Sequence, residues 1–326
     1  MFDMRRREII SLLGGAAVSW PIAGRAQQQG RMYRLGFLIP SGRKAPWVLA
    51  FLDELRLNGF IEGQNLAIIP GGFDAQVDLL AERAEAMVNA APDAIVGGPE
   101  PQLRVLQSAT RTIPLIGMTN DMVADGLVKS LARPGGNTTG ISLLSPQLDG
   151  KRQDILIEAV PGARRIAALA DSNVTSEQHI QTLRDAARSR NIELLAFGVA
   201  KPEDIAPAVN AAKAAGAEAL NFLASSLFFP VNRDDIESAA ATRLPAIHHW
   251  PEAAEGGGFL AYGPRFTQVW RQRARLTIKI LRGNNPADLP VEQPTNFELV
   301  INLRTAKTIG HEVPAGLVLR ADEVIE

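Results

Sequence analysis

The sequence predicts an α/β protein of two lobes, each built on a doubly wound parallel sheet. Three observations favour this class. A chain of 326 residues is too long for one compact core of usual size. From Tyr33 onward, short apolar runs alternate with longer amphipathic runs, which is typical of strands joined by crossover helices. Glycine and proline cluster in Arg133–Gly140, and the alternation then starts again, so two similar sheets are expected.

The first half of the chain supplies the elements of the first lobe. Its clearest helix has leucines at positions 49, 52, 55 and 57 and a stop at Gly59. The apolar runs predict four strands, at Tyr33–Ile39, Leu66–Pro70, Ala94–Gly97 and Pro114–Met118. The amphipathic runs between them predict three helices, at Trp47–Asn58, Val77–Ala90 and Gln102–Thr110.

The second half repeats the pattern. Strands are expected at Ile166–Asp171, Glu193–Gly198, Ala219–Leu223 and Pro245–His248. Helices are expected at Ser176–Arg190, Pro202–Gly216 and Val231–Thr242.

The chain should pass between the lobes several times. The turn Tyr262–Pro264 sends helix Phe266–Leu281 back to the first lobe, and the proline-rich segment Asn285–Pro294 crosses again. We therefore assign residues 31–138 and 265–288 to lobe 1, and residues 139–264 and 289–326 to lobe 2. Several crossing segments together form a multi-strand hinge.

The N-terminus has the layout of an export signal. Three arginines, at positions 5 to 7, precede an apolar run of about 14 residues, shorter than the roughly 20 that a membrane-spanning helix needs. The run ends at Gly24-Arg25-Ala26, with small residues before an expected cut after Ala26. Paired arginines followed by Glu8 and two isoleucines indicate the twin-arginine route, so residues 1–26 should be a cleaved signal peptide.

Composition excludes several classes of protein. The chain carries a formal net charge of −1 without a basic stripe, so nucleic acid is not an expected partner. It has no cysteine, which rules out the thioether lipid of a bacterial lipoprotein. The exported protein is therefore expected to be periplasmic, unlipidated and not inserted in the membrane.

The sequence lacks the common motifs that bind cofactors or metals. Gly135–Gly140 has Ile141 where a phosphate-binding loop needs lysine, and no dinucleotide fingerprint or nucleophile elbow occurs. Only four histidines are present, and the neighbours His248 and His249 should point to opposite faces of a strand. No cofactor and no metal are expected. Asp121 with His249 is the one pair that would suit an enzyme.

Residues that follow strands are the candidates for ligand contact. In open α/β sheets ligands bind beyond the carboxyl ends of strands, so two facing lobes would share one cleft. Aromatic rings there suit a ligand with an apolar or ring portion, although such rings can also cap the cores. Polar residues there can bind ligand or serve turns. The candidates are Ser41, Trp47, Gly98, Pro99, Asn120, Asp121, Asn173, Ser225, Phe228, His249, Trp250 and Tyr262.

Four segments make a more specific resemblance: Leu131–Gly140, Gly257–Pro264, Pro290–Leu303 and Arg320–Ile325. Together they resemble the ABC transporter substrate-binding protein family that includes tryptophan-binding members. The resemblance covers essentially the whole chain after the signal. It implies a type I periplasmic-binding fold, delivery of a solute to a membrane permease, and no catalysis.

The resemblance also implies site positions, at Ser41, Gly98, Pro99, Asn120, Asp121, Ser225 and Tyr262. Family members often have Gly-Asp-Pro-Val where this chain has Asn120-Asp121-Met122-Val123, so one wall of the site differs.

The expected function is that of the periplasmic solute-binding component of an ABC uptake transporter. It would trap a small molecule, an amino acid or a small aromatic compound, by closing its hinge. Three alternatives use the same cleft: a periplasmic enzyme, a ligand-sensing regulator, and a binding protein that serves a sensor kinase.

Overall fold

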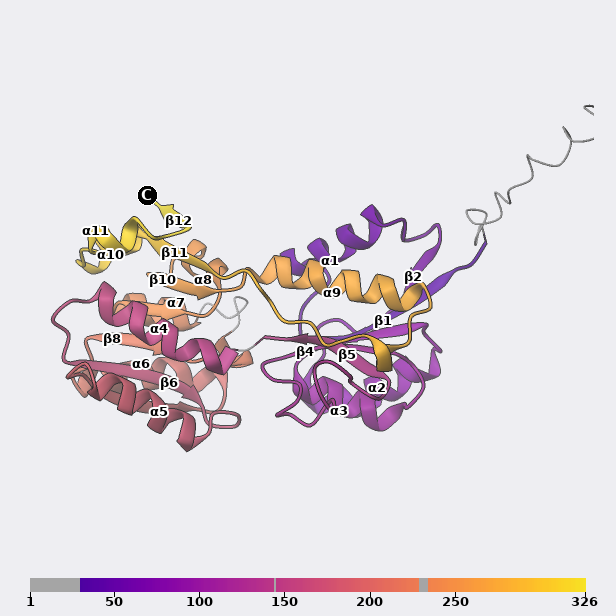
Figure 1. The fold of residues 1–326 in the computed structure, drawn as a ribbon, viewed down its shortest axis with the longest axis horizontal. Coiled ribbons are helices and arrows are strands. Elements are labelled where there is room, and N and C mark those ends of the chain that lie inside the picture. Colours follow the sequence, from indigo (N-terminus) through magenta and orange to yellow (C-terminus); the bar gives the residue numbers. More distant parts are fainter. Residues whose placement is uncertain (1–29, 144, 229–233) are drawn as a thin grey trace, which may run out of the picture.

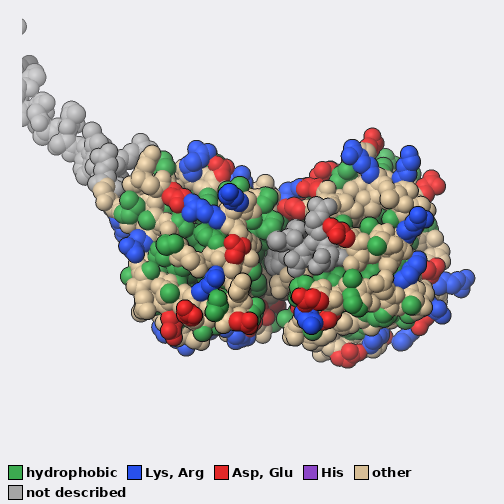
Figure 2. Space-filling model, turned by 180° about the vertical axis from the view of Figure 1, so that it is seen from behind, with side chains coloured by type: hydrophobic (Ala, Val, Ile, Leu, Met, Phe, Trp, Pro, Cys, Tyr) green, Lys and Arg blue, Asp and Glu red, His purple; other side chains and the backbone are tan. Residues whose placement is uncertain are grey.

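Two lobes lie side by side and are joined at a narrow waist (Figure 1). The computed structural model describes residues 30–143, 145–228 and 234–326. The predicted signal peptide, residues 1–26, lies outside the described residues. On the face shown in Figure 2, acidic and basic side chains are interspersed over both lobes.

The first lobe is built on a five-stranded parallel sheet of order β2-β1-β3-β4-β5. Its strands are largely apolar because helices cover both faces of the sheet (Figure 1). The strands are β1 (Tyr33–Leu38), β2 (Leu66–Ile68), β3 (Ala94–Gly97), β4 (Leu115–Thr119) and β5 (Thr138–Ser142). The helices are α1 (Pro46–Leu57), α2 (Leu80–Asn89), α3 (Glu100–Ala109) and α9 (Phe266–Leu281), with a short 3-10 turn η2 (Val77–Leu79) before α2.

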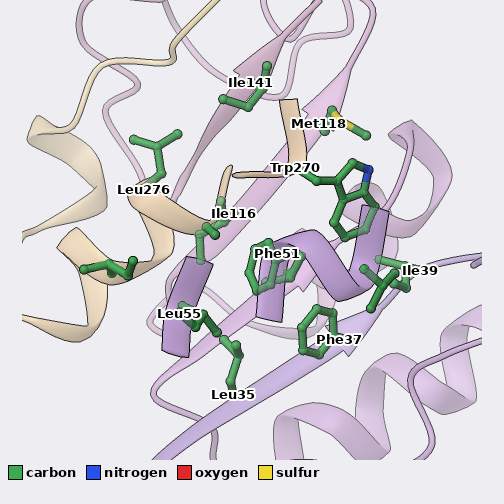
Figure 3. Close-up of a cluster of buried hydrophobic side chains, with 14 of the residues drawn as sticks. Leu35, Phe37, Ile39, Phe51, Leu55, Ile116, Met118, Ile141, Trp270 and Leu276 are labelled. Atoms are coloured by element: carbon green, nitrogen blue, oxygen red, sulfur yellow. The ribbon is translucent and has the colours of Figure 1, made fainter. Parts of the chain in front are cut away.

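Helix α9 belongs to this lobe although it comes late in the chain. Its Trp270 lies edge-on to Phe51 of α1, with ring centroids 6.0 Å apart, and Phe51 in turn contacts Phe37 of β1 at 5.5 Å (Figure 3). All three rings are buried. Burial of each such side chain contributes about 1.5–3 kcal/mol, so this core holds α9 on the N-terminal sheet.

The second lobe is built on a seven-stranded sheet of order β12-β11-β10-β9-β8-β6-β7. All of its strand pairs are parallel except β10 with β11, because β11 returns from the first lobe in the opposite direction. The strands are β6 (Arg165–Asp171), β7 (Glu193–Val199), β8 (Ala219–Phe222), β9 (Ala246–His248), β10 (Leu260–Gly263), β11 (Glu298–Asn302) and β12 (Glu323–Ile325). The helices are α4 (Ser145–Ala159), α5 (Glu177–Arg188), α6 (Ile205–Ala214), α7 (Asp234–Thr242), α8 (Pro251–Glu255), α10 (Leu303–Ile309) and α11 (Ala315–Val318), with 3-10 turns η3 (Pro202–Asp204) and η4 (Ser226–Phe228). The predicted fold class is confirmed.

The lobe boundaries differ from those expected in two places. Residues 138–142 form β5, which pairs with β4, so the first sheet continues past residue 138. Residues 289–292 also lie against this strand: Thr139 Oγ1 donates to the Leu289 carbonyl at 2.9 Å, and the Glu292 N–H donates to the Gly140 carbonyl at 2.9 Å. The segment between α9 and β11, with its 3-10 turn η5 (Pro286–Asp288), therefore runs along the first lobe before it crosses.

Gly140 belongs to the glycine-rich stretch where the boundary between the lobes was expected. Its φ is +154°, and a Cβ at this position would lie 2.1 Å from the Gly117 carbonyl oxygen. Close approach of two backbones requires a glycine inside this strand. The glycine cluster therefore serves a strand as well as the turn before it.

The chain passes from lobe to lobe at three places. These lie between β5 and α4, between β10 and α9, and between Glu292 and β11. At the second crossing, the Glu252 carboxylate of α8 accepts the Thr267 N–H at the start of α9, at 3.1 Å. Within the described ranges, no helix is both long and apolar enough to cross a membrane.

Candidate ligand-binding site

The carboxyl ends of the two sheets meet at one hydrogen bond between the lobes. Asn120 follows β4 of the first lobe, and its Nδ2 donates to the carbonyl of Ala224, which follows β8 of the second lobe, at 3.4 Å. Ser225 is the next residue. Strand ends are where open α/β sheets bind ligands, so this contact marks the candidate site.

On the first lobe, four predicted residues lie around the ends of β1 and β3. Ser41 is buried, and its Oγ accepts the Trp47 Nε1–H at 3.1 Å, which ties the loop after β1 to helix α1. The Gly98 N–H donates to the Leu38 carbonyl at 2.8 Å, and Pro99 is the N-cap of α3. Neither α1 nor α3 has a side-chain cap at its N-terminus. This edge therefore has the positive ends of two helix dipoles, with Glu100 in the first turn of α3.

Two predicted polar residues serve turns. The Asp121 carboxylate accepts the N–H groups of Val123 and Ala124, each at 3.0 Å. Asn173 is exposed, and its Nδ2 donates to Asp171 Oδ1 and to the Ala200 carbonyl, each at 3.0 Å. Asp and Asn side chains commonly bind nearby backbone in this way.

Ser225 is bound to a carboxylate that the sequence interpretation did not single out. Its Oγ donates to Asp171 Oδ2 at 2.5 Å and accepts the Leu227 N–H at 3.0 Å. Asp171 is the last residue of β6, and both side chains are buried, with 4% and 3% of Asp171 and Ser225 exposed.

A buried ionic cluster supports the loop after β8. Asp149 of α4 accepts Arg152 Nη2 at 2.5 Å and the Ala224 N–H at 3.0 Å through Oδ1. Its Oδ2 lies 2.9 Å from His179 Nε2. Asp149 and Arg152 are 2% and 1% exposed. Ala224 is therefore held through its N–H by Asp149 and contacted through its carbonyl by Asn120.

His249 lies beside this cluster and is neutral at ordinary pH. Burial lowers the pKa of the imidazole well below its usual value, and the positive charge of Arg152 lowers it further. A hydrogen bond with the backbone of Ser225 acts in the opposite direction but does not outweigh burial. His249 is 4% exposed.

The predicted aromatic residues mostly pack in cores. Trp47 of α1 and Trp250 of the second lobe both contact Phe266, with ring centroids 5.1 Å and 4.6 Å apart. All three are buried in the core cluster of the first lobe. Phe228 is buried against Phe222 inside the second lobe. The rings of Trp47, Trp250 and Phe228 therefore do not form an open surface.

Tyr262 is the one predicted ring that stays partly exposed. It lies on β10 with its ring centroid 6.4 Å from that of Phe297, and its carbonyl accepts Arg152 Nη1 at 3.3 Å.

The structure thus brings Asn120, Ser225 and His249 to one place and places Trp47 and Trp250 together at the hinge. The candidates predicted from the sequence did not include Asp149, Arg152 and Asp171. Their sequence signals were the i, i+3 acid–base pair on a helix and the carboxylate that ends a strand. Within the described ranges, no group of three or more His, Cys, Asp or Glu residues is arranged to hold a metal ion.

Comparisons with known proteins show the family and the fold of the chain. Residues 49–325 match the family model described as ABC transporter substrate binding protein. A tyrosine-binding protein of Clostridioides difficile is 26% identical over 270 residues, which cover 79% of this chain and 75% of that protein.

Solved structures share the fold. A conserved domain protein from Vibrio cholerae has a TM-score of 0.80 at 24% identity, over 90% of this chain and 100% of that chain. A Streptococcus domain solved in complex with L-Trp has a TM-score of 0.79 at 22% identity, again over 90% and 100% of the two chains.

Proposed function

The chain belongs to the ABC transporter substrate-binding protein family, and from that premise we propose that it captures an aromatic amino acid in the periplasm and delivers it to a membrane permease. Its relatives include a tyrosine-binding protein and a domain solved with L-Trp. The signal sequence proposed for residues 1–26 accounts for export, and the absence of cysteine means that the exported protein carries no thioether lipid.

One observation carries the proposal: the Asn120–Ala224 hydrogen bond, which joins the strand ends of the two lobes. A ligand that contacts both edges favours the closed arrangement, and closure is the state that a permease would recognise. We place Ser41, Gly98, Pro99, Asn120 and Asp121 on one side of the ligand. Ser225, His249 and Tyr262 lie on the other, with Asn173 and Phe228 beyond them, while Trp47 and Trp250 support the hinge.

The two edges suit a zwitterion. The first lobe has the uncapped N-termini of α1 and α3, which favour a carboxylate. The second lobe has buried carboxylates at Asp149 and Asp171. We expect no cofactor and no chemical change of the ligand.

The test is a thermal-shift screen of the exported protein against tyrosine, tryptophan, phenylalanine, other amino acids, sugars and nucleosides. A ligand at about 100 times its dissociation constant should add roughly 2.7 kcal/mol of stability. The aromatic amino acids should give the largest shifts and should be recovered unchanged. Consumption of the ligand would favour an enzyme, and shifts given by sugars alone would overturn the proposed ligand class.

Asn120→Ala should weaken binding roughly 3- to 10-fold, because one neutral hydrogen bond contributes about 0.5–1.5 kcal/mol. Asn137→Ala is the matched control, since this asparagine precedes β5, at the opposite end of that strand from the site, and its Nδ2 donates to the Ile113 carbonyl within its own lobe. Equal losses in the two variants would contradict a role for the contact between the lobes.

A further inference from the structure

Asp171 is a buried carboxylate at the site without a cationic partner among the described residues. Its Oδ2 accepts the Ser225 hydroxyl at 2.5 Å, and its Oδ1 accepts the Asn173 N–H and Nδ2 at 2.9 Å and 3.0 Å. All these donors are neutral. They fix the carboxylate in position, but no cation among the described residues compensates its negative charge.

The described side chains near Asp171 do not offset the negative charge of its carboxylate. The Arg152 guanidinium is bound to Asp149. His249 stays neutral because burial lowers the pKa of its imidazole. His179 contacts Asp149 rather than Asp171.

Other carboxylates near the site are already engaged. Asp149 has its own cation, and Asp121 is partly exposed and bound to two backbone N–H groups of its turn. Among the described residues, Asp171 therefore differs from these carboxylates in being buried without a cation as its partner. Burying an isolated charge is costly, and the usual solution is an opposite charge at hydrogen-bonding distance.

The position of Asp171 at the strand ends indicates that the ligand supplies the opposite positive charge. It ends β6, and its partner Ser225 directly follows Ala224, the residue that Asn120 of the other lobe contacts. A carboxylate accepts about four hydrogen bonds and a hydroxyl oxygen two, so Asp171 and Ser225 Oγ each keep acceptor capacity. An ammonium group has three donors and could use both.

We propose that Asp171, with Ser225, binds the ammonium group of the ligand. The ligand is then an amino acid rather than an aromatic acid without an amine. This inference rests on the proposed function, because it assumes a ligand between the two strand-end edges.

Paired ligands test the inference without any mutation. Calorimetry on the exported protein compares L-tyrosine with 3-(4-hydroxyphenyl)propionate, and L-tryptophan with indole-3-propionate. Each amino acid should bind about 30- to 1,000-fold more tightly than its partner, which lacks only the amine. The compound without an amine leaves the buried Asp171 carboxylate without an opposite charge, and this is costly. Equal affinities would overturn the inference and leave the proposed function intact. Failure of all four compounds to bind would contradict the proposed ligand class itself and this inference with it.

Asp171→Asn keeps the size of the side chain and most of its hydrogen bonds. This variant should lose the preference for the amino acid over the compound without an amine. The matched control is Asp154→Asn, which removes the same charge from a half-exposed pair with Arg190 on α4, outside the proposed site, and should keep the preference. If Asp171→Asn also keeps the preference, Asp171 is not the acceptor.

Discussion

The two lobes share an architecture but differ in the charges that they bury. In the first lobe, Arg273 of α9 is fully buried and donates to the Gly97 and Ile116 carbonyls, and none of its hydrogen-bond acceptors in the described part of the chain is a carboxylate. Burial lowers the pKa of Arg273 to about 9. In the second lobe, the carboxylates of Asp149 and Asp171 and the imidazoles of His248 and His249 are buried, and the other two histidines of the chain, His179 and His311, lie in the same lobe.

This difference indicates that the two lobes offer a ligand different kinds of group. We propose that the first lobe meets the ligand mainly with backbone and uncharged groups beside Asp121, whereas the second lobe meets it with the buried carboxylate of Asp171. Buried charges depend on their partners far more than apolar side chains do, because an unpaired charge in the interior is expensive. Three predictions test this contrast.

The largest effect is expected from breaking the ionic cluster of the second lobe. Asp149→Ala leaves Arg152 buried without its carboxylate and removes the acceptor of the Ala224 N–H. We expect a loss of about 3–5 kcal/mol in the free energy of unfolding, measured with urea. Asp154→Ala on the same helix is the control, because its pair with Arg190 is half exposed and should contribute at most about 1 kcal/mol. Similar losses in both variants would contradict the view that the buried charges of the second lobe depend strongly on their partners.

Trp250→Leu should lower the free energy of unfolding by a smaller amount, and its local effect should appear in the first lobe. Trp250 belongs to the second lobe by sequence but packs on Phe266 in the first. We expect a loss of about 2–3 kcal/mol, below the about 3–5 kcal/mol of a Trp→Ala change, with faster amide exchange in α1 and α9.

Phe228→Leu is the comparison for Trp250→Leu, because its ring packs inside the second lobe. It should leave amide exchange in α1 and α9 unchanged. If Trp250→Leu also leaves them unchanged, Trp250 does not couple the lobes.

The smallest effect concerns pH. The native pKa of His249 lies well below its usual value, so below about pH 6.5 the unfolded chain binds a proton that the native protein does not. His249 therefore contributes stability that is present above this pH and is lost as the pH falls toward 5. In His249→Gln the free energy of unfolding should fall less steeply with decreasing pH, by at most about 1.4 kcal/mol per pH unit. Urea unfolding at pH 7, 6 and 5 measures the slope, and identical slopes would refute this account.

Much of the fold could be predicted because its signals are local. The runs Ala94–Gly97 and Phe266–Leu281 match β3 and α9 residue for residue. Strand β5 was not recognised, and a lobe boundary was expected at its start, because a glycine needed for close backbone approach looks like one needed for a turn. Helix α4, which holds Asp149 and Arg152, was not identified.

The sequence by itself determined the two-lobed α/β class, the alternation of strands and helices, the return of α9 to the first lobe and the strand-end residues of the candidate site. These follow from periodicity and from the rule that parallel strands end on one edge. Only the tertiary structure decided which of those residues meet: Asn120 with Ala224, Ser225 with Asp171, and Trp250 with the core of the other lobe. The partners of Asn120 and Ser225 are 104 and 54 residues away in the chain, and local patterns carry no information about pairs so distant.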